Sequence, residues 1–277
     1  MDKHSPKIKK EIDRFKKAIN KDPLHSSKWD DFKKGYDDAV YQAYLDAART
    51  FKGIKDVLEN AGVKDAYTFL KTSEIHELLS SYFENEAPSD EDTFDNTHQT
   101  LCENVIKHFK KINYDIEYGK AQKIVNMSFK YLYCFDDAPE EYFKYCHLPL
   151  DSFTLEWIYR NVLSDHKKYQ KGKIAFWSKL QKGQPEQDEY RGADGKQYYS
   201  YDFYVKKVRE YLADTSKEYT PLQLEFKIWQ EIQMDLAAEA FWSALNPDAD
   251  KDEKIKFQEK DTKKKLETIK NCIICLE

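Results

Sequence analysis

The amino-acid sequence predicts an all-α protein, and three observations support that expectation. Only 8 of the 277 residues are Gly and only 8 are Pro, so turn-forming residues are scarce and helix formers dominate. Apolar side chains recur at steps of three and four residues, and no segment shows the alternation that is typical of strands. Aromatic residues make up 15% of the chain, which favours a packed interior over disorder.

Helical periodicity begins near residue 29 and continues through the first half of the chain. The first long helix is predicted from an apolar stripe that comprises Trp29, Phe32, Tyr36, Val40, Tyr44, Ala47 and Phe51. Gly53 and Gly62 bracket a short helix. Further helices are expected over 66–83 and 97–112, and the acidic residues between them predict an exposed loop near 84–96.

The clearest helical pattern of the middle lies over 117–135. Its core face is predicted to comprise Ala121, Ile124, Val125, Ser128, Leu132 and Phe135. Pro149 precedes another helix over 151–163, with Trp157 expected in the core. Residues 172–195 are rich in Gly and Lys with little periodicity, so we expect a surface excursion inside a basic loop near 164–196.

The last part of the chain is predicted to close the core with helices over 198–212 and 222–245, the latter burying Trp229 and Trp242. A highly charged helix over 250–275 is expected to dock through Leu266, Ile269 and Ile273. We therefore expect one compact helical unit. It is predicted to contain two intimate subdomains with a cleft between them, namely 1–115 with 196–277, and 116–195.

Composition also limits the protein class and its cellular location. The first residues are too charged for a secretory leader, and no apolar run approaches the roughly 20 residues that cross a bilayer. We therefore expect a soluble, cytoplasmic protein with reduced thiols and no membrane partner. Cys272 and Cys275 have the spacing of a metal or redox pair, but no second pair completes a zinc site. No phosphate-binding Gly-rich loop is present, so neither a metal nor a cofactor is expected.

The charge distribution leaves the question of a nucleic-acid partner open. A net charge of −5 argues against non-specific coating of nucleic acid. Two segments, 107–130 and 167–182, are nevertheless strongly basic. They either present one positive face or form ordinary solvated helix faces and loops.

The residues with the clearest chemical potential lie between Tyr118 and Ile158. Lys123, Asn126 and Lys130 are spaced i, i+3 and i+7, so they share one polar helix face, which carries no acid. Gln122 and Lys120 flank this face. The next helix begins at Asp151, shortly after His147.

A lysine and an aspartate at neighbouring helix starts suit one particular reaction. A neutral lysine amine can attack the anomeric carbon of a nucleotide and form a Schiff base. Nearby cations such as Lys120 and Lys130 would disfavour the charged amine of Lys123. The carboxylate of Asp151 could then accept the proton and stabilise positive charge on the sugar as the base departs.

These features resemble the helix-hairpin-helix (HhH-GPD) superfamily of DNA glycosylases, and within it the archaeal 8-oxoguanine glycosylase branch, often called AGOG. The resemblance is carried by Ala121, Lys123, Lys130, Tyr131, Tyr133, Pro149 and Asp151. It implies Lys123 as the Schiff-base nucleophile, Asp151 as its activating carboxylate, and an all-α fold that holds a flipped base between two subdomains. The superfamily's Leu-Pro-Gly-Val-Gly hairpin is absent and only Gly119 remains, so the grip on DNA would come from the basic segments.

We therefore expect a DNA N-glycosylase, with or without AP-lyase activity, that acts on a modified or damaged base. Lys123 and Asp151 are the expected catalytic residues. The residues expected to bind the substrate are Gln122, Asn126, Lys130, His147 and Lys120.

Other interpretations stay open from the sequence. The lysine face could simply be solvated, and Asp151 could serve only as a helix N-cap, a role that is compatible with catalysis. The chain could also be a non-catalytic nucleic-acid-binding protein or a helical adaptor that docks through its charged C-terminal helix. The glycosylase interpretation requires the amine of Lys123 to lie within several ångströms of the carboxylate of Asp151, both open to a cleft that admits a base.

Overall fold

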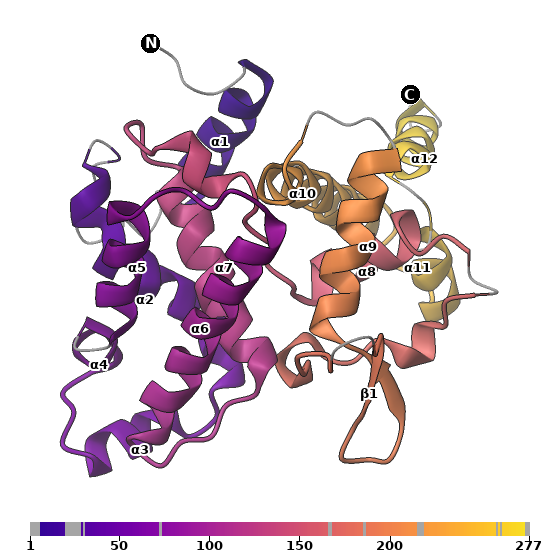
Figure 1. Ribbon diagram of the computed structural model, residues 1–277. Coiled ribbons are helices and arrows are strands. Elements are labelled where there is room, and N and C mark those ends of the chain that lie inside the picture. Colours follow the sequence, from indigo (N-terminus) through magenta and orange to yellow (C-terminus); the bar gives the residue numbers. More distant parts are fainter. Residues whose placement is uncertain are drawn as a thin grey trace. The chain divides into compact units, whose positions relative to one another are not determined.

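A computed structural model confirms the all-α class (Figure 1). Its described residues are 6–19, 29, 31–71, 74–165, 168–184, 187–214, 219–258, 260 and 262–274. Within them, regular structure consists of twelve α-helices, several short 3-10 turns and one two-stranded hairpin.

The elements follow one another with short connections. The α-helices are α1 Pro6–Ile19, α2 Tyr36–Ala47, α3 Ile54–Asn60, α4 Ala66–Lys71, α5 Glu74–Glu84, α6 Glu91–Lys110, α7 Tyr118–Tyr133, α8 Ser152–Asn161, α9 Tyr201–Asp214, α10 Pro221–Leu245, α11 Lys251–Gln258 and α12 Thr262–Ile274. The 3-10 turns are η1 Phe32–Gly35, η2 Ala48–Thr50, η3 Glu140–Phe143, η4 Lys171–Lys173 and η5 Trp177–Lys179. The strands are β1 Glu189–Arg191 and β2 Gln197–Tyr199.

The chain divides into two compact units, residues 1–225 and residues 226–277. The boundary falls inside α10. It differs from the expected grouping of 1–115 with 196–277 against 116–195, which stays a prediction.

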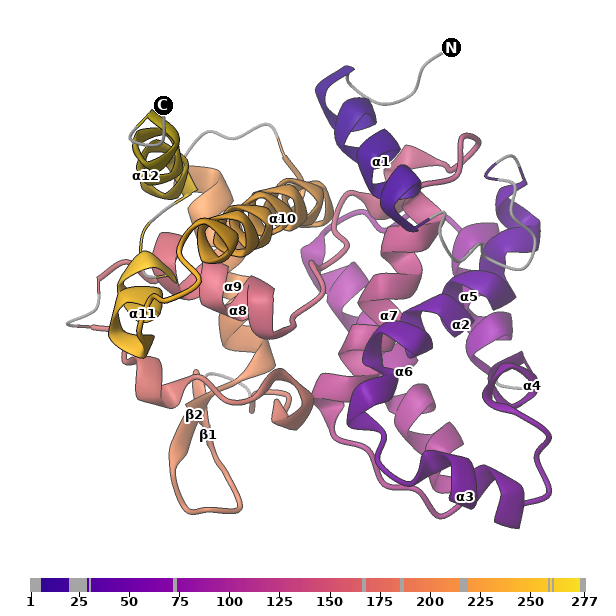
Figure 2. The same ribbon diagram turned by 180° about the vertical axis from the view of Figure 1, so that it is seen from behind.

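Helix α7 is the centre of the larger unit. Every one of its residues, from Tyr118 to Tyr133, is buried. It packs chiefly against α2 and α6, and its first turn meets η5 (Figures 1 and 2). The predicted apolar face of this helix is therefore confirmed, whereas the interpretation of its lysine face as a solvated surface is wrong. That face is buried because other parts of the chain supply the acids that the helix itself lacks.

Aromatic rings fill much of the space around α7. Phe32 meets Phe83 edge to face, with 4.7 Å between ring centroids, and Tyr36 stacks on the same ring at 5.8 Å. Phe129 of α7 lies 6.0 Å from Phe83. Edge-to-face and offset contacts of this kind add to the free energy of burial. The expected aromatic interior is thus confirmed, although Trp157, which was expected in the core, is only half-buried.

Two expected segments have different boundaries. The helical segment expected over 66–83 consists of two helices, α4 and α5. The expected loop near 84–96 covers only residues 85–90, because Asp90 acts as an N-cap. Its carboxylate accepts a hydrogen bond of 2.8 Å from the backbone N–H of Thr93. The acidic residues that follow therefore form the first turn of α6, where negative charge is favoured by the helix dipole.

The segment expected as a surface excursion is partly anchored. Its Trp177 and Leu180 are buried, and β1 and β2 form an antiparallel hairpin that is visible in Figure 2. The backbone N–H of Gly119 in α7 donates to the carbonyl oxygen of Leu180 at 2.8 Å. The described part of this loop is therefore attached to the first turn of the central helix.

The unit of residues 226–277 has a small core of its own. Trp242 stacks on Phe257 with 4.6 Å between ring centroids, and Ala238 and Ile269 complete the cluster. Lys265 is almost fully buried and pairs with two acids, which are Asp235 at 3.1 Å and Glu239 at 2.7 Å.

Several expectations about this unit require correction. The expected single helix over 250–275 is two helices, α11 and α12. Ile269 is buried as expected, but Leu266 is exposed. Trp229 is half-buried, and the side chain of Ile273 lies outside the described residues.

The cysteines add no cross-link to the described part of the fold. Cys102, Cys134 and Cys146 are buried and free. The side chain of Cys272 and the whole of Cys275 lie outside the described residues. Among the described helices, none combines the length and the apolar character needed to cross a membrane.

Gly119 provides a direct test of the packing around α7. A Cβ atom at this position would lie 1.9 Å from the carbonyl oxygen of Trp177. Gly119→Ala should therefore lower the free energy of unfolding by about 3 kcal/mol, because a backbone atom cannot yield as a side chain can. Urea denaturation checks this value. Gly172→Ala is the control, since a Cβ atom added there would meet nothing within 4 Å, and equal stabilities of the two variants would contradict the packing described.

Candidate active site

Lys123 and Asp151 meet at the centre of the larger unit. The Lys123 Nζ atom donates to Asp151 Oδ2 at 2.8 Å. Lys123 lies in the second turn of α7, and Asp151 is the N-cap of α8. The convergence of these two residues, which are 28 positions apart, meets the first requirement of the glycosylase interpretation.

The two carboxylate oxygens of Asp151 have different partners. Oδ1 accepts hydrogen bonds of 2.9 Å from the backbone N–H groups of Phe153 and Thr154. The Thr154 hydroxyl in turn accepts from the backbone N–H of Asp151 at 2.7 Å, which completes a capping box. Oδ2 is left to face Lys123. Asp151 is therefore both a helix cap and the partner of the lysine, and the helix fixes its orientation.

The electrostatics of the pair favour charged groups. Burial favours the neutral form of each residue, but their mutual attraction and hydrogen bond outweigh it. As a result the pKa of Lys123 is raised and the pKa of Asp151 is lowered, the latter also by its backbone hydrogen bonds. The expected lowering of the lysine pKa by Lys120 and Lys130 is wrong, because the acids around Lys123 dominate. At rest the site holds an ammonium and a carboxylate.

A second carboxyl group, Asp46 of α2, lies in the same electrostatic environment. Burial raises the pKa of Asp46 even though the charges of Lys123 and Lys130 lower it. Its Oδ2 atom accepts a hydrogen bond of 2.7 Å from the hydroxyl of Tyr131. Sequence reasoning does not find Asp46, because it lies far from the lysine in the chain and belongs to no motif.

The other two lysines of α7 bind acids of their own. Lys130 pairs with Glu225 at 2.5 Å and lies 3.9 Å from the centroid of the Phe15 ring. Lys120 pairs at 2.8 Å with Glu117, which directly precedes the helix. Both amines are thereby held by protein groups, so a role for Lys120 or Lys130 in substrate binding stays a prediction.

Gln122 and Asn126 are fully buried next to the Lys123–Asp151 pair. The amide of Gln122 donates to the carbonyl oxygen of Leu150 at 2.8 Å and accepts from the backbone N–H of the same residue at 3.2 Å. Asn126 donates to the Gln122 amide oxygen at 3.0 Å. Both side chains are satisfied by protein groups, so their expected contacts with a substrate also stay a prediction.

His147 joins this network from the other side. Its Nε2 atom lies 2.8 Å from Asp95 Oδ1, and its Nδ1 atom lies 2.8 Å from the hydroxyl of Tyr201. Arg209 holds Asp95 through two hydrogen bonds, of 2.8 Å and 2.7 Å. Burial lowers the pKa of His147 more than the charge of Asp95 raises it. The imidazole is therefore neutral at pH 7.

His98 of α6 is a further member that sequence reasoning does not find. Its ring stacks on Tyr201 with an interplanar angle of 3°, and its Nε2 atom lies 2.8 Å from the amide oxygen of Asn126. Burial lowers the pKa of His98 well below its usual range, and the nearby His147 contributes in the same direction. A single histidine in a helical segment carries no sequence signal that distinguishes this position from a surface one.

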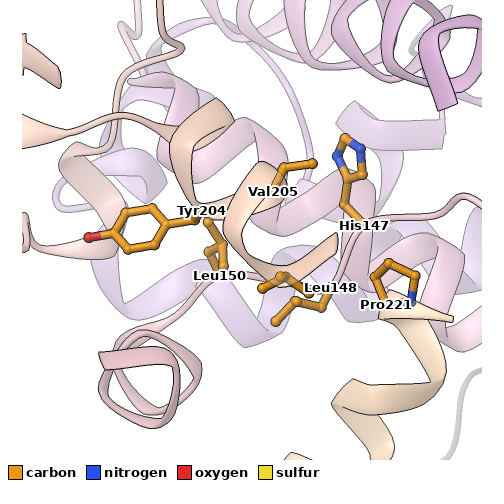
Figure 3. Close-up of a pocket in the computed structure, with 7 residues that line it drawn as sticks. His147, Leu148, Leu150, Tyr204, Val205 and Pro221 are labelled. Carbon is orange, nitrogen blue, oxygen red and sulfur yellow. The ribbon is translucent and has the colours of Figure 1, made fainter. Parts of the chain in front are cut away.

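A small hollow borders the network at His147 (Figure 3). Apolar side chains surround it, including Leu148, Val205 and Pro221, and its volume is about 10 Å³. That space suits about one water molecule and is too small for a base. Neither Lys123 nor Asp151 lines it.

The two basic segments present less positive charge than their sequences suggest. In the second segment Lys171 pairs with Glu156 at 3.3 Å, and Lys173 pairs with Glu189 at 2.6 Å. Lys179 pairs with Glu117, while Lys167 lies outside the described residues. In the first segment the lysines of α7 are buried in pairs. A single positive face stays a prediction.

No cluster of three or more metal-ligating side chains is found among the described residues. Comparisons of the chain with protein-family models, with curated proteins and with solved structures give no match. The interpretation of the site therefore depends on its own geometry.

The Lys123–Asp151 pair should contribute measurably to the free energy of unfolding, and its contribution should depend on pH. Lys123→Gln is expected to lower the free energy of unfolding by about 3 kcal/mol at pH 7, because it leaves a mostly buried carboxylate without its cation. Asp151 has a lowered pKa in the folded protein, so its stabilisation is present above its usual pKa of about 3.9 and is lost as the pH falls through the lowered value. Lys123 has a raised pKa, so its contribution persists up to about pH 10 and is lost above it.

The difference between wild type and Lys123→Gln should therefore be constant from about pH 5 to pH 9 and should shrink below about pH 4. Denaturant titrations at several pH values measure it. Lys16→Gln is the control, since Lys16 pairs with the exposed Asp136 at 2.7 Å and its loss should cost less than about 1 kcal/mol. A difference that does not change with pH would argue against a charged pair.

The buried histidines predict a second pH effect. Because the folded pKa values of His98 and His147 are depressed, the neutral rings stabilise the fold above the usual histidine pKa of about 6.5. Stability should fall as the pH drops below that value, by up to about 1.4 kcal/mol per pH unit for each ring. His98→Gln should reduce this slope in denaturation experiments between pH 7 and pH 5. An unchanged slope would show that His98 is not the group that takes up the proton.

Proposed function

We propose that this protein is a DNA N-glycosylase in which Lys123 is the nucleophile and Asp151 is its activating carboxylate. One observation carries the proposal: the Lys123 amine and the Asp151 carboxylate, contributed by separate helices, meet at 2.8 Å. The same two residues are among those that carry the resemblance to the helix-hairpin-helix glycosylases. The proposal leaves open which base is removed and whether AP-lyase activity accompanies its removal.

The resting ion pair defines the first step of the proposed reaction. Lys123 is charged, so its proton must move to Asp151 before the amine can attack. The lone pair on Nζ then forms a bond to C1′ of the deoxyribose, and the C1′–N bond to the base breaks. The base departs with that electron pair and takes up the proton that Asp151 received. The attached nitrogen then returns a proton to Asp151. Its lone pair forms the C1′=N bond as the C1′–O4′ bond breaks, and O4′ takes up that proton, so the sugar ring opens and a Schiff base links Lys123 to C1′.

Fixed orientation is the main contribution of the fold to this reaction. The capping box holds Asp151 through Oδ1, so Oδ2 keeps its direction towards Lys123 after the amine has lost its proton. A carboxylate held in this way also stabilises positive charge that develops on the sugar. Preorganisation of this kind requires no rearrangement during the reaction.

Access sets the main condition on the proposal. The side chain of Lys123 is 6% exposed and that of Asp151 is 21% exposed. The carboxylate side of the pair is therefore the more open one, and a sugar must approach along it. The amine and the carboxylate already lie at hydrogen-bonding distance, but the space beside them does not admit a base. We expect DNA binding to open that space.

Borohydride trapping tests the proposed nucleophile. Labelled duplex and single-stranded DNA carrying abasic, oxidised or otherwise modified bases are incubated with the wild-type protein and with Lys123→Gln. We expect a covalent adduct with at least one substrate for the wild type and none for the variant, because borohydride reduces the Schiff base that Lys123 forms and a glutamine amide forms none. Asp151→Asn should slow adduct formation by about 100-fold or more, since removing a general base of this kind typically costs 10²–10⁴.

Lys16→Gln is the matched control, because it removes a lysine from an ion pair outside the site and should trap as the wild type does. Equal adduct formation by Lys123→Gln and wild type would assign the chemistry to another amine. The absence of any adduct with abasic DNA would remove the lysine mechanism and leave the ion pair with a purely structural role.

A further inference from the structure

We infer that Gln122 is a positioning residue that holds the backbone before Asp151 against α7 and thereby sets the geometry of the Lys123–Asp151 pair. This inference rests on the proposed function for its catalytic consequence. Its structural part, the control of the ion pair by a neutral amide, can be tested without any activity. It replaces the expected substrate contact of Gln122 with a different role.

The observation is a paired hydrogen bond between one side chain and one backbone unit. The Gln122 amide nitrogen donates to the Leu150 carbonyl oxygen at 2.8 Å, and the amide oxygen accepts from the Leu150 N–H at 3.2 Å. Gln122 directly precedes Lys123, and Leu150 directly precedes Asp151. The two members of the ion pair are therefore connected through their immediate neighbours.

The hydrogen-bonding capacity of Gln122 is fully used. Its nitrogen also donates to the carbonyl oxygen of Gly119 at 2.9 Å, and its oxygen also accepts from Asn126 at 3.0 Å. An amide with two donor hydrogens and two acceptor lone pairs has no capacity left for a substrate. The residue is also 0% exposed. Gln122 therefore acts through the backbone of its neighbours and does not touch the reacting atoms.

The orientation of the Gln122 amide is fixed by a chain of hydrogen bonds that begins at Asp95. Asp95 is held by Arg209 as a carboxylate and lies closer to His147 Nε2, at 2.8 Å, than the Arg209 nitrogen does at 3.2 Å, so the neutral His147 donates to Asp95 from Nε2. The His147 Nδ1 atom then accepts from the hydroxyl of Tyr201. The Tyr201 oxygen accepts from the amide nitrogen of Asn126 at 3.0 Å. The donor direction of each bond thus follows from the preceding one.

Asn126 determines the orientation of the Gln122 amide. Because the Asn126 nitrogen donates to Tyr201, the Asn126 oxygen faces His98 Nε2 at 2.8 Å and accepts from it, and the same nitrogen also donates to Gln122. The Gln122 oxygen then faces Asn126, and its nitrogen faces the Leu150 carbonyl. A flipped amide would bring two donors together at Asn126 and two acceptors together at Leu150. The buried network therefore allows one orientation of Gln122 and one position of the chain before Asp151.

Two substitutions separate positioning from folding. Gln122→Glu keeps the size and the acceptor of the side chain but removes the amide donor to Leu150. Gln122→Met keeps the length and removes both bonds. Ser128→Ala is the matched control, because Ser128 is buried on the same helix and its hydroxyl bonds within that helix, to the Ile124 carbonyl oxygen at 2.8 Å. Thermal melting shows which variants remain folded.

The first readout is the trapping rate on abasic DNA under single-turnover conditions. Both Gln122 variants should lower this rate by about 10- to 100-fold, since a displacement of about 1 Å at a reacting pair has an effect of that size. The concentration of DNA at half-maximal rate should stay within about twofold, because Gln122 does not contact DNA. Ser128→Ala should trap at the wild-type rate. Weaker DNA binding at an unchanged maximal rate would instead make Gln122 a binding residue.

The second readout is the pKa of Lys123, followed by NMR of protein with ¹³C-labelled lysine and assigned by comparison with Lys123→Gln. A displaced Asp151 no longer holds the lysine pKa up, so that pKa should fall in Gln122→Met, which adds no charge of its own, and stay unchanged in Ser128→Ala. Wild-type pKa and wild-type rate in a folded Gln122→Met variant would overturn the inference. If the wild type forms no adduct while the Lys123 pKa still depends on Gln122, the proposed function fails and the positioning role stands.

Discussion

The complete burial of α7 is the constraint on which the larger unit depends. A helix that carries three lysines can lie in the interior only if each charge is paired, because an unpaired buried ammonium costs several kcal/mol. The acids come from outside the helix: Glu117 precedes it for Lys120, Asp151 serves Lys123, and Glu225 serves Lys130. The connection to α8 and the start of α10 are therefore held at α7 by charge as well as by packing.

In the Lys123–Asp151 pair, Asp151 is both the N-cap of α8 and the partner of the lysine. A free aspartate at this position would lose orientation when its lysine changed charge. The N-terminus of α8 prevents this, because two backbone N–H groups hold Oδ1 regardless of the state of Lys123. The hydrogen bonds of Gln122 hold the main chain at Leu150 and do not involve the charged atoms of the pair. Helix cap and amide network together fix the carboxylate from both sides.

The sequence allows the all-α class and the helix over 117–135 to be predicted, and the glycosylase resemblance adds the expectation that Lys123 and Asp151 converge. Periodicity identifies the apolar face of α7, and a Pro-x-Asp segment identifies the start of α8. Periodicity does not reveal whether a polar face is solvated, since Lys123 and Lys130 have the same spacing on a wet helix and on a buried one. The sequence also carries no signal for the positions of Asp46 and His98. They reach the site through the packing of α2 and α6, which depends on contacts between residues far apart in the chain.

Comparison of the buried ion pairs gives the reason for proposing Lys123, and not Lys130, as the nucleophile. Glu225, the partner of Lys130, is 5% exposed and holds its lysine against the ring of Phe15, so both charges are enclosed. Asp151 is 21% exposed while its lysine is 6% exposed. The Lys123–Asp151 pair is thus the less enclosed of the two. The proposed reaction depends on such access, because the sugar must reach both the amine and the carboxylate.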